Sequence, residues 1–337
     1  MRGKRPAGGE SGSPLPVLQW AQEHGEVGGV RTSHAQLTSA LRAEAIPVDY
    51  VDTGSARRAL SMLPALVQRR SLHLLHLTRL WRAVLLAPVF GLLRGRTVLV
   101  LHSGSTADQV ARMGALRLRT LVLALHAYDE IWAVNDDIGA NLPDALRSRI
   151  TVVTPFDSSA APVQTDVPRE PHSLALATNG GLAHYNAELG IETVRLVRER
   201  WPDATLTILA YGNDTPEVER LRRTAEVEPW LSVAFDAPPD EVSAVLARTG
   251  TFLRPTSWDG DSVIVREAQA SGATVVASDA APRPAGVVLA PLEAGALAVA
   301  VTEGGPVSDG HGLATTSLAD AVRAVEVDVR PRRLGRP

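Results

Sequence analysis

The sequence contains no cysteine and only one lysine, Lys4. Without cysteine the chain can form no disulfide, no catalytic thiolate and no zinc-thiolate site. Arginine supplies all the other permanent positive charges, a bias that a GC-rich bacterial genome would produce. No apolar run is long enough to span a bilayer, and no hydrophobic signal segment opens the chain. The sequence therefore predicts a cytoplasmic protein.

Net charge is also small, at -3 with a pI of about 6.3. A protein without a global basic field is not expected to bind nucleic acid. The chain has 337 residues, of which 45% are hydrophobic, so it can form two domains that each bury a core.

Short apolar strands alternate with helical segments along most of the chain, a pattern typical of doubly wound parallel sheets. A stretch rich in proline, serine and acids interrupts the pattern between Pro155 and Pro171, as a linker would. We expect a disordered tail over residues 1–13, a first domain over 14–157, a linker over 158–171, a second domain over 172–305 and a further helix over 316–327.

Hydrophobic periodicity and turn residues locate the individual elements. In the first domain we expect strands over 15–20, 47–51, 72–77, 97–101, 129–134 and 150–153, with helices over 30–44, 79–96, 107–127 and 138–147. In the second domain we expect strands over 173–178, 205–211, 231–235, 251–253, 273–278 and 286–289, with helices over 190–201, 216–227, 240–248 and 263–271.

The stretch from Thr251 to Ser278 reads as strand, loop, helix and strand. Asp261 or Ser262 can cap the helix, and Gly272 stands where a left-handed residue should end it. Such a helix directs its first N–H groups and the positive end of its dipole at the loop, which is how open α/β sheets hold a phosphate. The stretch therefore predicts an anion site.

Two acids flank this helix start: Asp259 lies in the loop and Glu267 lies in the helix, with seven residues between them. A carboxylate repels phosphate, so near an anion site it is expected to accept hydrogen bonds from neutral hydroxyls, such as the diol of a sugar. The alternative is an ordinary strand-helix-strand unit with a solvated acid at each end. We favour sugar binding because the acids, the cap and the glycines agree at fixed spacing.

This arrangement resembles the donor-site signature of retaining GT-B glycosyltransferases, specifically glycosyltransferase family 4. The resemblance implies an α/β fold with two doubly wound, Rossmann-like domains facing across a cleft, and a last helix that crosses back to the first domain. It also implies that Glu267 holds the nucleotide ribose and Asp259 the transferred sugar, although the family usually has glutamate at the position of Asp259. The rest of the donor site is expected from Arg254, Asp261, Ser262, Val263 and Arg266.

Two features of the first domain add to the resemblance. Gly28 and Gly29 follow the first strand, where family members carry a glycine pair under the donor, although such a pair often serves only a tight turn. His102 follows the strand over 97–101 and resembles the histidine that faces the donor sugar in the family. Without the resemblance we would interpret His102 as an ordinary loop histidine. His76, at the end of the strand over 72–77, is a weaker candidate.

One departure from the family concerns the diphosphate. Members usually grip it with an arginine and a lysine after the first strand of the second domain, and residues 178–190 of this chain contain neither. The loss of a charged donor weakens binding by about 1.5–3 kcal/mol without abolishing it. We expect a retaining glycosyltransferase with a nucleotide-sugar donor. The alternatives are a non-catalytic GT-B-like subunit that binds a partner enzyme or a glycan and, third, a sugar-nucleotide epimerase.

The same resemblance implies an acceptor that is a glycan, a glycolipid or a small molecule. It implies no cofactor, and we expect no metal, because Asn135, Asp136 and Asp137 suit a helix cap and the acids near Gly260 lie at a helix start that is already positive. The segment over 79–96 mixes apolar residues with arginines. We interpret it as a core helix bent at Pro88, the alternative being a peripheral contact with an anionic membrane.

Overall fold

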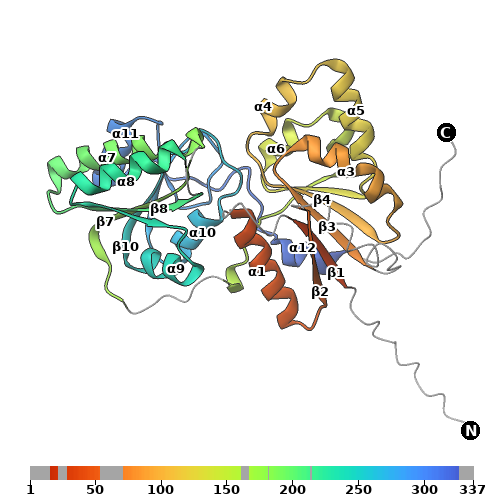
Figure 1. Cartoon of the computed structure of the whole chain (residues 1–337), viewed down its shortest axis with the longest axis horizontal. Coiled ribbons are helices and arrows are strands. Elements are labelled where there is room, and N and C mark those ends of the chain that lie inside the picture. The colour runs from red at the N-terminus through yellow and green to blue at the C-terminus, as the bar shows by residue number, and fades with distance from the viewer. Residues whose placement is uncertain are drawn as a thin grey trace, which may run out of the picture.

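The computed structural model describes residues 16–21, 29–53, 71–160, 167–180, 182–212 and 215–325. The expected tail over 1–13, residue Gly28 and residues 161–166 of the expected linker lie outside these ranges. The described residues form two six-stranded parallel sheets, each flanked by helices (Figure 1). The expected fold class, two doubly wound α/β domains, is therefore confirmed.

The first domain has the strand order β2-β1-β3-β4-β5-β6. Its strands are β1 (Val17–Ala21), β2 (Val48–Asp52), β3 (Leu72–Leu77), β4 (Arg96–Leu101), β5 (Glu130–Ala133) and β6 (Ile150–Val152). Its helices are α1 (Gly29–Ala43), α3 (Leu80–Leu92), α4 (Thr106–Ala111), α5 (Ala115–Leu125) and α6 (Asp136–Ala140), with the 3-10 turns η2 (Asp144–Arg149) and η3 (Ser158–Ala160). The strand order reverses between β1 and β3, and ligands of such sheets bind at the carboxyl ends beside a reversal.

Two expected helices of this domain are wrong in extent. The helix expected over 107–127 is two helices, because α4 ends at Ala111 and the extended Gly114 starts α5. The helix expected over 138–147 ends at Ala140, and Pro143 leads into the 3-10 turn instead. Asn135 does cap α6, since its side chain accepts a hydrogen bond from the N–H of Ile138 at 2.9 Å.

The second domain has the strand order β12-β11-β10-β7-β8-β9. Its strands are β7 (Glu170–Asn179), β8 (Thr205–Tyr211), β9 (Leu231–Phe235), β10 (Thr249–Arg254), β11 (Thr274–Ser278) and β12 (Val288–Ala290). Its helices are α7 (Ala187–Arg200), α8 (Pro216–Val227), α9 (Pro239–Arg248), α10 (Val263–Ala270) and α11 (Ala294–Glu303), with the 3-10 turn η4 (Ala183–Tyr185). Gly272 follows α10 with φ +84°, the left-handed conformation expected of it.

The last described helix, α12 (Leu318–Ala324), lies on the first domain. Val322 of α12 belongs to the same buried cluster as Leu41 of α1. An ion pair between Arg323 and Glu44 adds to this contact at the surface. The chain thus returns to its first domain after completing the second.

The two segments that connect the domains run side by side at Thr154. The N–H of Thr154 donates to the carbonyl of Thr316 at 2.9 Å, and the N–H of Leu318 donates to the carbonyl of Thr154 at 3.0 Å. These bonds fasten the outgoing and the returning segment to each other where both meet the first domain.

Loops at the carboxyl ends of the two sheets also contact each other. The loop after β10 lies against the loop after β4 so closely that a Cβ atom on Gly260 would stand 2.5 Å from the carbonyl oxygen of His102. A Cβ atom on Gly104 would collide with the backbone of Asp259 in the same way. Glycine at both positions lets the predicted donor loop reach the strand end that carries His102.

Candidate functional site

The site is built around two helix starts, those of α1 and α10, which lie beside each other (Figure 1). A Cβ atom on Gly29, the first residue of α1, would stand 3.9 Å from the side chain of Val263, the first residue of α10. The first N–H groups of a helix have no partner within it, and the dipole is positive there. Two positive helix ends therefore meet at one point between the domains.

Ser262 holds the N-cap position of α10 but makes no side-chain cap hydrogen bond. The cap expected from Ser262 or Asp261 is therefore wrong, because the carboxylate of Asp261 is directed elsewhere. Neither side chain occupies the N–H groups that start α10, so they can serve an external acceptor such as a phosphate.

Glu267 lies on α10, half-buried, and faces α1. Its Oε1 accepts a hydrogen bond from Nε2 of Gln36 at 3.0 Å. Burial raises the pKa of Glu267 to about 7, and the hydrogen bond from Gln36 opposes the shift. A ligand that donates hydroxyl hydrogens to this carboxylate would favour its ionised form. Sequence reasoning missed Gln36, which is a buried polar residue on the face of α1 otherwise expected to be core.

Asp259 is held by two arginines. Arg254 donates from Nε at 2.8 Å and from Nη2 at 3.1 Å, and Arg283 donates from Nη1 at 2.8 Å. Burial alone would raise the pKa of Asp259, but the two guanidinium groups lower it to about 2. Two cations share one anion, so this cluster carries a net positive charge. Arg283 was not identified from the sequence, where it stands in a loop after β11.

Asp261 and Arg266, both expected at the donor, pair with each other. Nε of Arg266 lies 2.6 Å from Oδ1 of Asp261, and the hydroxyl of Thr154 donates to Oδ2 at 2.6 Å. Burial raises the pKa of Asp261, against the effect of these two partners. Because Thr154 belongs to the first domain, the buried Asp261 joins the domains in this structure.

Aromatic rings occupy the turn after β7, where the resemblance led us to look for an arginine and a lysine. His184 of η4 stacks on Trp258, with the ring centroids 3.7 Å apart and the planes 11° apart, and Tyr185 lies beside His184. Asn186 ties this turn to the donor loop by donating to the carbonyl of Pro255 at 2.9 Å. Burial lowers the pKa of His184 to about 4, so the stack is neutral at neutral pH. Positive charge for an anion must come from the helix starts and the arginine pair.

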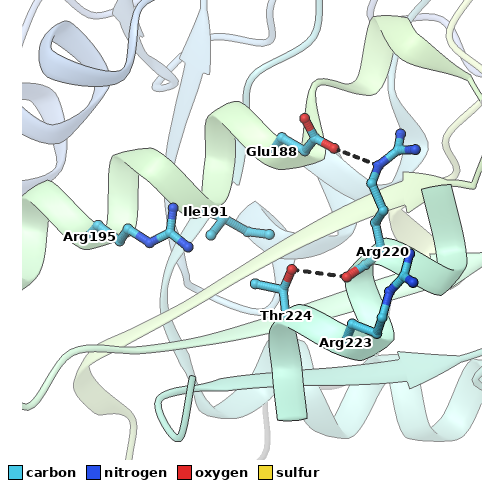
Figure 2. A pocket seen from close by; sticks show the side chains of 6 residues that line it. All are labelled: Glu188, Ile191, Arg195, Arg220, Arg223 and Thr224. Atoms are coloured by element: carbon cyan, nitrogen blue, oxygen red, sulfur yellow. Dashed lines mark hydrogen bonds and ion pairs between the residues drawn. The ribbon is translucent and has the colours of Figure 1, made fainter. Parts of the chain in front are cut away.

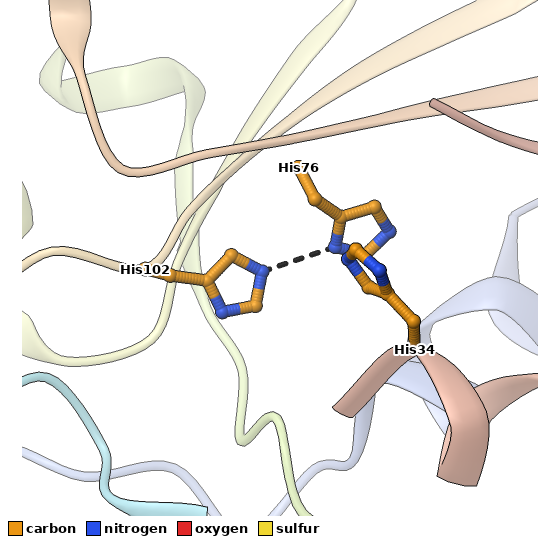
Figure 3. Close-up of side chains that lie close together, drawn as sticks. All are labelled: His34, His76 and His102. Carbon is orange, nitrogen blue, oxygen red and sulfur yellow. Dashed lines mark hydrogen bonds between the residues drawn. The ribbon is translucent and has the colours of Figure 1, made fainter. Parts of the chain in front are cut away.

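His102 belongs to a group of three histidines in the first domain (Figure 3). His76 at the end of β3 bonds through Nδ1 to Nε2 of His102 at 3.0 Å, and the ring of His34 lies 4.1 Å from that of His76. Burial lowers the pKa of His102 to about 4 and the pKa values of His34 and His76 well below the ordinary value. All three imidazoles are therefore neutral. Sequence reasoning did not single out His34, which lies within α1.

A shallow hollow of about 320 Å³ lies elsewhere on the second domain, between α7 and α8 (Figure 2). It is lined by Glu188, Ile191, Arg195, Arg220, Arg223 and Thr224. Arg220 pairs there with Glu188 at 3.0 Å. The hollow contains none of the expected site residues and lies on the helical layer, so it is separate from the candidate site.

Neither a protein-family model nor a curated protein matches the chain. Solved structures do match it. OtsA in its apo form has a TM-score of 0.61 at 13% identity, covering 92% of this chain and 93% of OtsA. HepE from Anabaena, solved with UDP, has a TM-score of 0.59 at 14% identity, and the match covers 85% of this chain and 89% of HepE. The catalytic domain of starch synthase IV from Arabidopsis thaliana, solved with ADP and acarbose, has a TM-score of 0.55 at 12% identity. That match covers 80% of this chain and 84% of the starch synthase domain. Together with the two six-stranded sheets, these likenesses show that the chain has the two-domain, Rossmann-like GT-B fold.

Proposed function

We propose that this protein is a glycosyltransferase that moves a sugar from a nucleotide-sugar donor to an acceptor hydroxyl. The observation that carries the proposal is the meeting of the starts of α1 and α10 beside Glu267. N–H groups suited to a diphosphate thereby adjoin a carboxylate suited to a ribose diol. The ligands of two proteins with this fold, UDP in HepE and ADP in starch synthase IV, support the same interpretation.

Charge balance supports a diphosphate at this place without a lysine. The diphosphate of a nucleotide sugar carries two negative charges. Each helix start contributes about half a positive elementary charge. The cluster of Asp259, in the loop before α10, with Arg254 and Arg283 contributes one net positive charge. Together these groups come to about two positive charges, or about one when the ionised Glu267 is counted, so they replace part of the charge of the missing arginine and lysine.

We further propose that transfer retains the anomeric configuration and needs no metal at the diphosphate. The leaving diphosphate would be stabilised by the fixed N–H groups, and its own oxygen would take the acceptor proton, as the resemblance to family 4 implies. The neutral His102 would face the donor sugar from the first domain. An NMR analysis of the product tests retention, since an inverted anomeric centre contradicts it. Assays with and without Mg²⁺ and Mn²⁺ should give equal rates.

The first experiment is a thermal-shift screen of the protein against nucleotides and nucleotide sugars. A ligand at a hundred times its Kd should stabilise the fold by about 2.7 kcal/mol. Glu267→Ala should abolish the shift, whereas Glu226→Ala, at an exposed site on α8, should preserve it. If no nucleotide stabilises the wild type, the proposed donor site is wrong.

That negative result would favour the second candidate, a non-catalytic subunit that binds a partner enzyme or a glycan. Its specific support is that Arg254 and Arg266, the two arginines expected at the donor, both have carboxylate partners in this structure. Co-purification with a partner, together with an absence of nucleotide-sugar cleavage, distinguishes this candidate from an active enzyme.

A second proposal concerns the outer face of the first domain. None of the described helices is both long and apolar enough to cross a membrane. The inner face of α3 is core, as expected, with Phe90 fully buried. Its outer face exposes Trp81 by 56%, Leu85 by 66% and Leu92 by 83%, at spacings that place them on one side of the helix.

The neighbouring α5, which packs against α3, also exposes Leu116 and Leu123. Arg94, Arg117 and Arg119, which lie on α5 or just after α3, are exposed, and neither residues 79–96 nor 112–127 include an acid. Apolar side chains surrounded by arginines suit a surface of anionic lipid. We propose that this face makes a peripheral membrane contact, which would place the acceptor side near lipid.

Vesicle sedimentation tests the contact. The protein should bind vesicles that contain phosphatidylglycerol more strongly than vesicles of phosphatidylcholine alone. The double variant Trp81→Ser, Leu85→Ser should lose binding, and Val227→Ser, which removes a still more exposed apolar residue from the second domain, should keep it. Equal binding by all three proteins would contradict the proposal.

A further inference from the structure

Three histidines from three separate elements converge in the first domain (Figure 3). His34 comes from α1, His76 from the end of β3, and His102 from the residue after β4. The register of the sheet, with Leu77 opposite Leu101, places His76 and His102 at neighbouring strand ends. One ring nitrogen of each histidine lies within 4.8 Å of those of the other two.

The spacing of these nitrogens suits a shared metal ion. Two imidazole nitrogens that bind one tetrahedral Zn²⁺ at about 2.0–2.1 Å lie about 3.4 Å apart. Nδ1 of His76 and Nε2 of His102 are 3.0 Å apart, so a small separation of the two rings would admit an ion between them. His34 approaches the same point from the side, with its ring at 67° to that of His76.

The buried nitrogens of this cluster also lack partners. His34 is 2% exposed, and neither of its ring nitrogens has a hydrogen-bond partner. Nε2 of His76 is likewise buried and unpaired. Such groups are rare in folded proteins and call for a missing partner, such as a water or an ion. Among the described residues no carboxylate joins the group, and neutral imidazole alone is a ligand set for transition metals rather than for Mg²⁺ or Ca²⁺.

We propose that His34, His76 and His102 bind a divalent transition-metal ion such as Zn²⁺. The site lies in the first domain and is distinct from the donor diphosphate. Its effect would be to anchor α1 to the ends of β3 and β4. Gln36 stands two residues after His34 on the same helix and bonds to Glu267 of the second domain. The ion would therefore hold in place the helix that makes the contact with Glu267.

The test is metal binding by the full chain, which does not depend on transfer. Protein stripped of metal and then passed through a desalting column after Zn²⁺ loading should retain one ion per chain. His34→Ala and His76→Ala should weaken Zn²⁺ binding at least about tenfold. His126→Ala, at an exposed histidine of the same domain, should leave it unchanged.

A second readout guards against variants that fold poorly. Co²⁺ bound by three histidines in a four-coordinate site gives an intense visible spectrum. The wild type and His126→Ala should show it, and His34→Gln, which keeps a polar side chain of similar size, should not. Thermal stability should rise with Zn²⁺ in the first two proteins only. Zn²⁺ binding that is equal in the wild type and His34→Gln, or binding to neither, would overturn the proposal. Nucleotide binding measured on the same samples reports on the donor site separately.

Discussion

The strongest quantitative prediction concerns the charge of Glu267. Burial raises its pKa from 4.5 to about 7, which corresponds to a cost of about 3 kcal/mol for ionising it in the free protein. If ribose hydroxyls donate to the ionised carboxylate, the donor binds only the fraction of protein in which Glu267 has lost its proton. That fraction is about one tenth at pH 6 and about nine tenths at pH 8. Donor affinity should therefore rise about tenfold between pH 6 and pH 8.

Calorimetric titration with an intact nucleotide sugar measures this effect, because its doubly esterified diphosphate does not itself titrate over this range. Glu267→Gln keeps the shape of the side chain and its reach to Gln36 but removes the charge. Its affinity should be weak and independent of pH. Wild-type affinity that is constant, or that rises as pH falls, would refute the assignment of the ribose to an ionised Glu267.

The same pKa shift predicts a change in stability. The folded protein binds a proton at Glu267 up to pH 7, whereas the unfolded chain releases it near 4.5. The free energy of unfolding should therefore fall between these pH values, by up to about 3 kcal/mol. Glu267→Gln should be more stable than the wild type at pH 8, as measured by urea denaturation, and should lose this pH dependence. A gain in stability with a loss of binding is typical of a functional residue.

Two further substitutions test buried polar groups, one within the second domain and one between the domains. Asp259→Asn leaves Arg254 and Arg283 without a charged partner and should destabilise the protein by about 3–5 kcal/mol in urea denaturation. Thr154→Val removes the hydroxyl that donates to Asp261 and should cost about 1–3 kcal/mol in the same measurement.

Matched controls make both results specific. Glu226→Ala removes an exposed acid from the second domain. Thr151→Val changes an exposed threonine of β6, three residues before Thr154. Each control should change stability by less than about 0.5 kcal/mol. If Asp259→Asn were as stable as Glu226→Ala, then the two arginines would not depend on Asp259, and its carboxylate would be available to a sugar.

The elements whose boundaries could be predicted are those with sharp local signals. Thr215 and Pro216 mark the start of α8, and the strands β8 and β9 on either side follow the expected bounds. The break between α4 and α5 escaped prediction because both helices direct apolar residues at one core, so the pattern continues across Gly114. The helix α11 was also not predicted. Its sequence is apolar almost throughout, so apolar and polar residues do not alternate with the period of a helix.

In the candidate site, too, features with a local sequence signal were predictable and features that depend on distant residues were not. The spacing of Asp259 and Glu267 located the loop and helix in one stretch of sequence, and the glycine pair located the partner helix. Partners distant in sequence were not predictable, because one sequence by itself does not show which residues meet in the fold. Arg283 reaches Asp259 from another loop, and Gln36 reaches Glu267 from another domain. The roles of the acids at the donor stay predictions.

The return of α12 to the first domain has a consequence for how the protein is made. A ribosome completes N-terminal domains first, and they fold as units when they can. Here the buried cluster around Leu41 includes Leu318 and Val322, which are synthesised almost 280 residues later, as the bond between Glu44 and Arg323 shows by its sequence separation of 279. Translation must therefore pass through the entire second domain before this one of the first domain's two core clusters can close.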